Sequence, residues 1–122
     1  MSRLHKPHRA PGRYETDRQR HARVLQYIHD ALDTALSLDE MASVAGLPLL
    51  RFLRSFSQAV GSTPHAYITE TRLQKARTLL HTTNDSLVAI SLECGFAHQS
   101  HLGAAFKERL GVTPGEYREL QR

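Results

Sequence analysis

Cys94, His98 and His101 are the side chains whose types and spacing most directly suggest reactive chemistry. A thiol and two imidazoles could bind Zn²⁺, or they could pair a nucleophile with its base. A structural zinc site needs a fourth ligand, and none is apparent in the pattern. Neither a glycine-rich phosphate-binding loop nor a paired-carboxylate motif occurs in the chain. We therefore predict that the protein is not an enzyme and that it uses no metal and no cofactor.

Arg54 and Gln99 could make a different kind of contact, with the edges of nucleic-acid bases. An arginine can donate two hydrogen bonds to guanine, and a glutamine can bond adenine through both of its amide atoms. Such contacts require a helix that projects into the major groove of DNA. The secondary structure around Arg54 and Gln99 therefore decides whether they can act in this way.

The net charge of the chain, +4, is concentrated at its N-terminus. Residues 1–23 contain seven Lys and Arg against two acidic residues, a net charge of +5, whereas residues 24–122 have a net charge of −1. A nucleic-acid surface in the rest of the chain would therefore need a local cluster of cations. We interpret residues 1–16 as a basic flexible arm, and we favour a solvated linker over a groove-reading arm.

Length and composition indicate a small protein without a membrane span. At 122 residues the chain allows one compact domain or two very small ones. No apolar run approaches the roughly 18 residues of a membrane-spanning helix, and no apolar stretch follows the basic N-terminus, as it would in a secretory signal. The single Cys94 excludes an intramolecular disulfide and agrees with a reducing compartment. We expect a cytoplasmic protein with no membrane partner.

Capping and turn residues divide the chain into about seven helices, so we predict an all-α fold. The expected helices span residues 16–33, 38–45, 48–60, 64–83, 87–94, 100–110 and 114 onward. Ser37 with Glu40, and Thr113 with Glu116, have the spacing of capping boxes. In the helix that starts at Pro48, the residues expected to share the buried face are Phe52, Phe56 and Ala59. The helices that end at Gly46 and Gly95 are both short and are both followed by a tight turn and another helix.

The two halves of the chain repeat one another. Five residues recur fifty positions later: Phe56, Gly61, Thr63, Pro64 and Tyr67 return as Phe106, Gly111, Thr113, Pro114 and Tyr117. A small residue also stands four positions before each turn glycine, Ala42 before Gly46 and Ser91 before Gly95, where the helices of a helix-turn-helix unit must approach closely. The fixed offsets favour two related helix-turn-helix units over a bundle with coincidental Thr-Pro caps.

These residues also carry a family resemblance. The resembling stretches are Ser86-Leu87-Val88-Ala89-Ile90-Ser91-Leu92-Glu93-Cys94-Gly95-Phe96, then Gln99-Ser100-His101-Leu102, Phe106-Lys107 and Gly111-Val112-Thr113-Pro114-x2-Tyr117-Arg118. Together they resemble the C-terminal signature of AraC/XylS-type transcription regulators. Residues 37–80 likewise resemble the first helix-turn-helix and the long connecting helix of that family, including Arg72-Leu73-x2-Ala76-x2-Leu79-Leu80.

The resemblance implies a seven-helix fold whose two recognition helices enter successive major grooves of double-stranded DNA. It implies a sequence-specific transcription regulator, activator or repressor, with RNA polymerase as a further partner. The expected parts are the arm (1–16), the first helix-turn-helix unit (17–63), the connecting helix (64–83) and the second unit (84–122). Most members add an effector-binding domain, for which this chain has no room, so the resemblance is to short single-domain members or to an isolated DNA-binding part. We expect a monomer.

Helical geometry selects the candidate contacts with DNA. With Phe52 and Phe56 turned inward, the outward positions of the first recognition helix include Arg54, for which a surface salt bridge is the alternative role. Leu50 and Leu53 could contact thymine methyl groups or could broaden the core. The candidates for base contact are Leu50, Leu53, Arg54, Gln99, Ser100 and His101. The candidates for phosphate contact are Arg51, Ser57, Arg72, Lys75 and Lys107, and for the cations a solvated surface role is equally open.

The second unit departs from the family pattern. Gly103 and Ala104 stand where the family frequently has a hydroxyl residue and an arginine, so this unit is expected to add affinity more than specificity. The neutral charge of residues 24–122 and the apolar Leu50, Leu53 and Ala104 also allow a second hypothesis, a protein-interaction module that keeps the fold without reading DNA.

Overall fold

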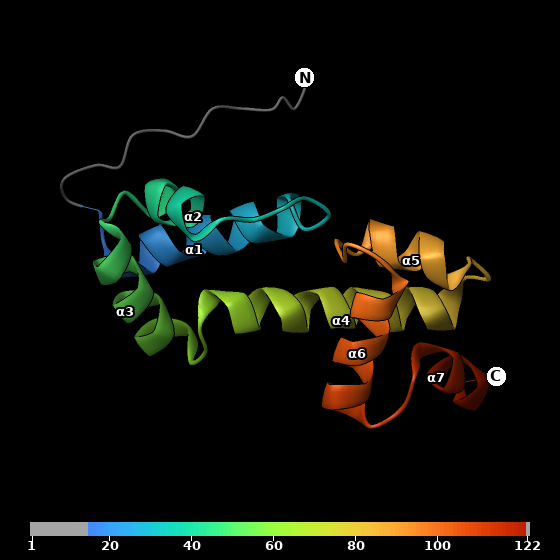
Figure 1. Ribbon diagram of the computed structural model, residues 1–122. Coiled ribbons are helices and arrows are strands. Elements are labelled where there is room, and N and C mark those ends of the chain that lie inside the picture. Colours follow the sequence, from blue (N-terminus) through green and yellow to red (C-terminus); the bar gives the residue numbers. More distant parts are fainter. Residues whose placement is uncertain (1–14, 122) are drawn as a thin grey trace, which may run out of the picture. The chain divides into compact units, whose positions relative to one another are not determined.

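The computed structural model describes residues 15–121, so most of the predicted arm (1–16) lies outside the described residues. The described residues form seven helices and no strand (Figure 1). The helices are α1 (Asp17–Asp30), α2 (Leu38–Ala45), α3 (Leu49–Val60), α4 (Pro64–Thr82), α5 (Leu87–Glu93), α6 (Gln99–Leu110) and α7 (Pro114–Leu120). The predicted all-α fold is confirmed.

The chain divides into two compact units that interleave along the sequence. The first unit holds α1, α2 and α3, in residues 15–30 and 36–64. The second unit holds residues 31–35 and 65–122, with α5, α6, α7 and all of α4 except its first residue. Each unit contains one short helix, a tight turn and a second helix, in the order of a helix-turn-helix.

The core of the first unit forms where one face of each helix is apolar. Val24 and Ile28 of α1, Met41 of α2, and Phe52 and Phe56 of α3 are almost completely buried. The rings of Phe52 and Phe56 lie 5.5 Å apart between centroids. Because both phenylalanines point inward, the opposite face of α3 is left toward solvent.

The second unit has an equivalent core built by four helices. Buried side chains of α4 and α5 surround Leu102 and Phe106 of α6, both fully buried. The ring of Phe106 meets the ring of Tyr117 edge to face at 5.3 Å. Leu102 and Phe106 thus hold α6 as Phe52 and Phe56 hold α3, which is the equivalence that the repeat predicts.

The caps of α7 and α2 lie where the sequence predicts them, with one refinement at α2. At α7, Thr113 and Glu116 form a complete capping box, and the hydrogen bond from the Thr113 backbone N–H lowers the pKa of the Glu116 carboxyl. At α2 the Ser37 hydroxyl accepts from the Glu40 N–H at 3.0 Å. The Glu40 carboxylate accepts a hydrogen bond from that same hydroxyl instead of from the Ser37 backbone, so this cap is only half of a capping box.

Four expectations about helix ends and burial need correction. The first helix ends at Asp30 instead of at residue 33, because the next residues form a turn in which the Thr34 N–H and hydroxyl both donate to the Ala31 carbonyl. Pro48 is the N-cap of α3, with an extended ψ of 151°, and not its first helical residue. Gln99 is already helical, because His98 is the extended residue that precedes α6. Ala59 is exposed, so the buried face of α3 ends at Phe56.

Candidate nucleic-acid interface

The turn between α2 and α3 sets the direction of α3. Gly46 adopts a left-handed conformation with φ of 72°, and the Leu47 N–H donates to the Ala42 carbonyl at 3.0 Å. This hydrogen-bonded turn is a common way to end a helix at a glycine. In addition, His21 Nε2 of α1 and the hydroxyl of Ser55 in α3 are hydrogen bonded at 3.1 Å. The turn and this bond together fix which face of α3 is turned outward.

Five of the predicted contact residues lie on the outward face of α3 or at its edge. Leu50 is 72% exposed, so it does not broaden the core. Arg51 and Arg54 are exposed, and within residues 15–121 neither forms an ion pair, which removes the alternative of a surface salt bridge for Arg54 there. Leu53 and Ser57 lie at the edge of this face and are partly buried.

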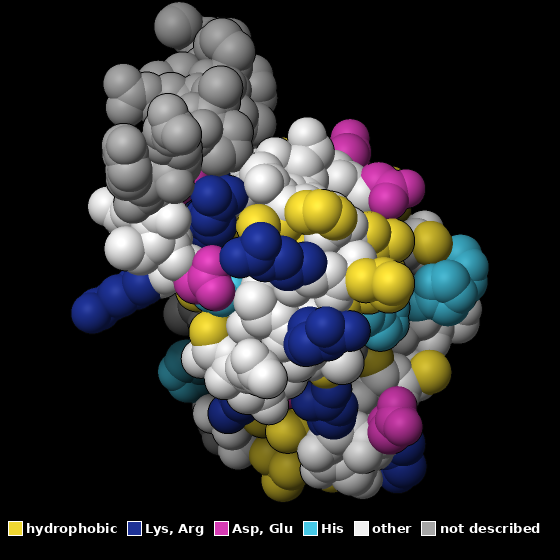
Figure 2. Space-filling view, turned by 90° about the vertical axis from the view of Figure 1, so that its left-hand side faces the viewer, with side chains coloured by type: hydrophobic (Ala, Val, Ile, Leu, Met, Phe, Trp, Pro, Cys, Tyr) yellow, Lys and Arg dark blue, Asp and Glu magenta, His cyan; other side chains and the backbone are white. Residues whose placement is uncertain are grey.

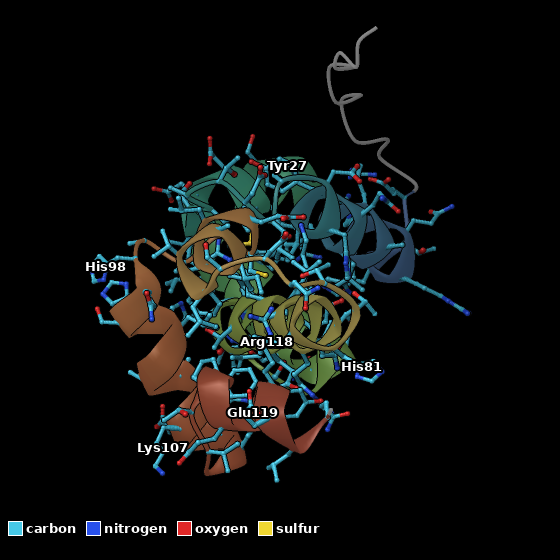
Figure 3. The ribbon with its side chains drawn as sticks, turned by 90° about the vertical axis from the view of Figure 1, so that its right-hand side faces the viewer. Tyr27, His81, His98, Lys107, Arg118 and Glu119 are labelled. Atoms are coloured by element: carbon cyan, nitrogen blue, oxygen red, sulfur yellow. The ribbon has the colours of Figure 1, made fainter. Side chains whose placement is uncertain are left out.

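The predicted contact residues of the second unit gather at the start of α6. Gln99, Ser100 and His101 are all exposed. The His98 and His101 rings lie 3.9 Å apart between centroids, and His98 Nδ1 is hydrogen bonded to the Ser100 hydroxyl at 2.7 Å. Figure 3 shows His98 and Lys107 pointing away from the α6 ribbon. The exposed face of α6 is therefore polar at its N-terminal end, and farther along it carries Lys107 with the exposed Glu108 beside it.

Arg72 and Lys75, both predicted to contact phosphates, bind carbonyl groups of the chain itself. Arg72 Nε donates to the Leu32 carbonyl at 3.1 Å, and one of its terminal nitrogens donates to the Thr34 carbonyl at 2.7 Å. Lys75 Nζ donates to the carbonyl of Glu93, the last residue of α5, at 3.2 Å. Burial of the guanidinium lowers the pKa of Arg72. These cations help to hold the second unit together.

Gly95 completes the arrangement around Arg72. Its φ is +91°, and a Cβ atom built on it would lie 2.1 Å from the Leu32 carbonyl oxygen and 2.6 Å from Arg72 Nε. Only glycine therefore allows the segment 31–35 to pack this closely against the turn before α6.

Arg20 and Arg23 bind carbonyl groups within the first unit, a role that no sequence pattern indicated. Arg20 donates to the Ala45 carbonyl at 2.7 Å, and Arg23 Nε donates to the Val44 carbonyl at 2.8 Å. Arg23 also pairs with Glu15, and this hydrogen bond lowers the pKa of the Glu15 carboxyl. Cations at the C-terminal end of α2 donate hydrogen bonds to its last carbonyls and interact favourably with the negative end of the helix dipole. Part of the positive charge near the N-terminus is thus structural.

Cys94, His98 and His101 do not form a joint site. Cys94 is fully buried, and burial raises the pKa of its thiol to about 11. The two histidines are exposed. No group of three or more His, Cys, Asp or Glu side chains is placed to hold a metal ion within residues 15–121.

The burial of Cys94 predicts a thiol that does not react in the folded protein. Iodoacetamide needs a thiolate, which is scarce at neutral pH when the pKa is about 11. We expect no alkylation in buffer and complete alkylation in denaturant, measured by the mass of the intact protein. Rapid modification of the folded protein would contradict the position of Cys94.

Comparison with known proteins decides the family. A family model described as a helix-turn-helix domain matches residues 41–120, which include α3, α4 and α6. A solved AraC-type DNA-binding protein from Chromobacterium violaceum has 30% sequence identity, a TM-score of 0.78, and coverage of 85% of this chain and 93% of that chain. The chain belongs to the AraC-type helix-turn-helix family.

Other relatives of this AraC-type chain are transcription regulators. The regulator MtrA of Neisseria gonorrhoeae is 35% identical over 96 residues, which are 79% of this chain and 32% of MtrA. The activator RhaS of Escherichia fergusonii is 33% identical over 96 residues, or 79% of this chain and 34% of RhaS. The chain thus spans about a third of the length of these relatives.

One solved AraC-type neighbour contains DNA. The DNA-binding domain of AdpA, in complex with a target DNA, has a TM-score of 0.80 and 27% identity, with coverage of 84% of this chain and 92% of that chain.

Among residues 15–121, no helix has both the length and the hydropathy that a membrane span requires.

Proposed function

We propose that this AraC-type chain is a sequence-specific DNA-binding regulator of transcription that reads major grooves with the outward faces of α3 and α6. The observation that carries the proposal is the exposed face of α3, where Arg54 has no salt-bridge partner in the described residues and stands opposite two buried phenylalanines. The solved complex of the AdpA domain with DNA supports the same use of the fold.

The proposed contacts differ between the two units. In the first unit Arg54 contacts a guanine, and Arg51 and Ser57 contact phosphates. In the second unit the proposed contacts are Gln99, Ser100 and His101 with bases and Lys107 with a phosphate. We assign Arg72 and Lys75 to the fold, because both cations bind the chain's own carbonyls.

The difference between the two units has consequences for the site. Because α3 and α6 present different side chains, one copy of the chain should bind an asymmetric sequence, and we propose that it acts as a monomer. RNA polymerase is the further partner that we propose, with the cytoplasm as the place of action.

Selection from random oligonucleotides at moderate salt tests the proposed function. We expect enrichment of one asymmetric motif. Enrichment of none would overturn the proposal and favour a protein-interaction module, and a palindromic motif would contradict a single copy engaging both units.

Replacing Arg54 with alanine should relax specificity at one base pair. A bidentate arginine–guanine contact contributes about 1–3 kcal/mol of discrimination, or roughly 5- to 150-fold in Kd. Binding to the selected site and to its single-base variants, measured by fluorescence anisotropy, should show this loss at one position. The neighbouring Arg51→Ala variant is the control, because loss of a phosphate contact weakens binding to all sequences alike. If both variants lost the same affinity on every sequence, Arg54 would not be a base contact.

A further inference from the structure

The start of α3 exposes leucines on the face proposed to meet DNA. Leu50 is 72% exposed and Leu49 is 37% exposed, while Leu53 is partly buried beside them. In Figure 2, which looks onto the side where α3 lies in Figure 1, hydrophobic side chains and Lys or Arg side chains are intermingled on the surface. Leu50 precedes Arg54 by four positions, so the two side chains lie on neighbouring turns of the same helix face.

An apolar side chain in the major groove has one matching chemical group. Guanine, cytosine and adenine present hydrogen-bond donors and acceptors there, and only thymine adds a methyl group. A leucine placed against donors and acceptors would desolvate them without a replacement bond, which is unfavourable. The contact that suits Leu50 is therefore a thymine methyl group.

We propose that Leu50, with Leu53 at its side, recognises the 5-methyl group of thymine next to the base read by Arg54. This inference rests on the proposed function and adds the chemical class of base that the first unit prefers. The second unit differs, because Gln99, Ser100 and His101 offer hydrogen-bonding groups at the corresponding end of α6. Dependence on thymine methyl groups should thus be strongest in the half of the binding site that α3 reads.

The charges around Leu50 favour DNA over a protein as its partner. Arg51 follows it directly and Arg54 lies one turn later, and both are exposed without an ion pair within the described residues. Two guanidinium groups beside an apolar side chain match a surface that combines phosphates with methyl groups. A neutral apolar partner surface would leave these two charges desolvated and unpaired.

Uracil substitution tests the proposal, because deoxyuridine differs from thymidine only by the missing methyl group. Each thymine of the selected motif is replaced in turn, and Kd is measured for the unmodified chain, for Leu50→Ala and for Leu120→Ala. Leu120 is 71% exposed and is the matched control. For the unmodified chain and for Leu120→Ala we expect about fourfold weaker binding at one or two thymines, the equivalent of one buried methyl group. For Leu50→Ala the same uracil substitutions should change Kd by less than about 1.5-fold, because the apolar contact is already gone.

The outcomes separate this proposal from the proposed function. If a motif is selected but no thymine responds to uracil, or if Leu50→Ala responds as strongly as the unmodified chain, the methyl contact is overturned while DNA binding stands. Leu50 would then be free to contact a protein. If no motif is selected, both proposals fall. Far-UV circular dichroism checks that each variant is folded. We expect both to be, because substitutions at exposed positions change stability little.

Discussion

Replacing Gly95 with alanine should lower the free energy of unfolding of the protein by about 3–5 kcal/mol. Two effects add at this position. An L-residue at φ of +91° is strained by about 1–2 kcal/mol. The new Cβ would also collide with the Leu32 carbonyl oxygen, which is backbone and is held in place by Arg72. Urea unfolding followed by circular dichroism gives the change.

Gly61 provides the matched control for this substitution. Its φ is +89°, nearly that of Gly95, but a Cβ atom there would meet nothing within 4 Å. We expect Gly61→Ala to cost only the strain, about 1–2 kcal/mol. Similar losses at Gly61 and Gly95 would show that the close approach of the segment 31–35 contributes nothing.

Replacing Arg72 with alanine should destabilise the protein by about 2–4 kcal/mol without changing the salt dependence of DNA binding. The substitution removes two charge-assisted hydrogen bonds to the Leu32 and Thr34 carbonyls. A phosphate contact would show the opposite pattern, with unchanged stability and a slope of log K against log salt that is smaller by about 1. Lys107→Ala should give that second pattern, because Lys107 is exposed on α6.

Arg72→Lys separates the two roles further. Lysine keeps the charge that a phosphate requires, but it lacks the planar fork that reaches two carbonyls at once. We therefore expect Arg72→Lys to lose most of the stability that Arg72→Ala loses. If Arg72→Lys kept the full DNA affinity and stability of the unmodified chain, Arg72 would instead act as a phosphate contact.

The features that were predictable from the sequence depend on neighbouring residues. The capping box at Thr113 and Glu116, the turn at Gly46 and the inward phenylalanines of α3 are all set by residues a few positions apart. Such local signals sufficed for seven helices and for the outward face that carries Arg54.

The features that were missed depend on partners far along the chain. The carbonyls bound by Arg72 lie 38 and 40 residues before it, and the carbonyl bound by Lys75 lies 18 residues after it. A cation on a helix has the same sequence pattern whether it faces a phosphate or a distant carbonyl. Leu50 was ambiguous for a similar reason. The sequence pattern allows either a contact with DNA or a place in the core, and only its 72% exposure in the structure rules out the core.

The interleaving of the units matters for anyone who would recombine such regulators. Residues 31–35 are separated in sequence from the rest of the second unit by α2 and α3, so no single cut in the chain separates the two units. A hybrid that joins a foreign first half to this chain at residue 64 would lose Leu32, and Gly95 would face an unrelated loop. Transferring residues 31–35 together with residues 65–122 should preserve the fold of the second unit and the outward face of α6.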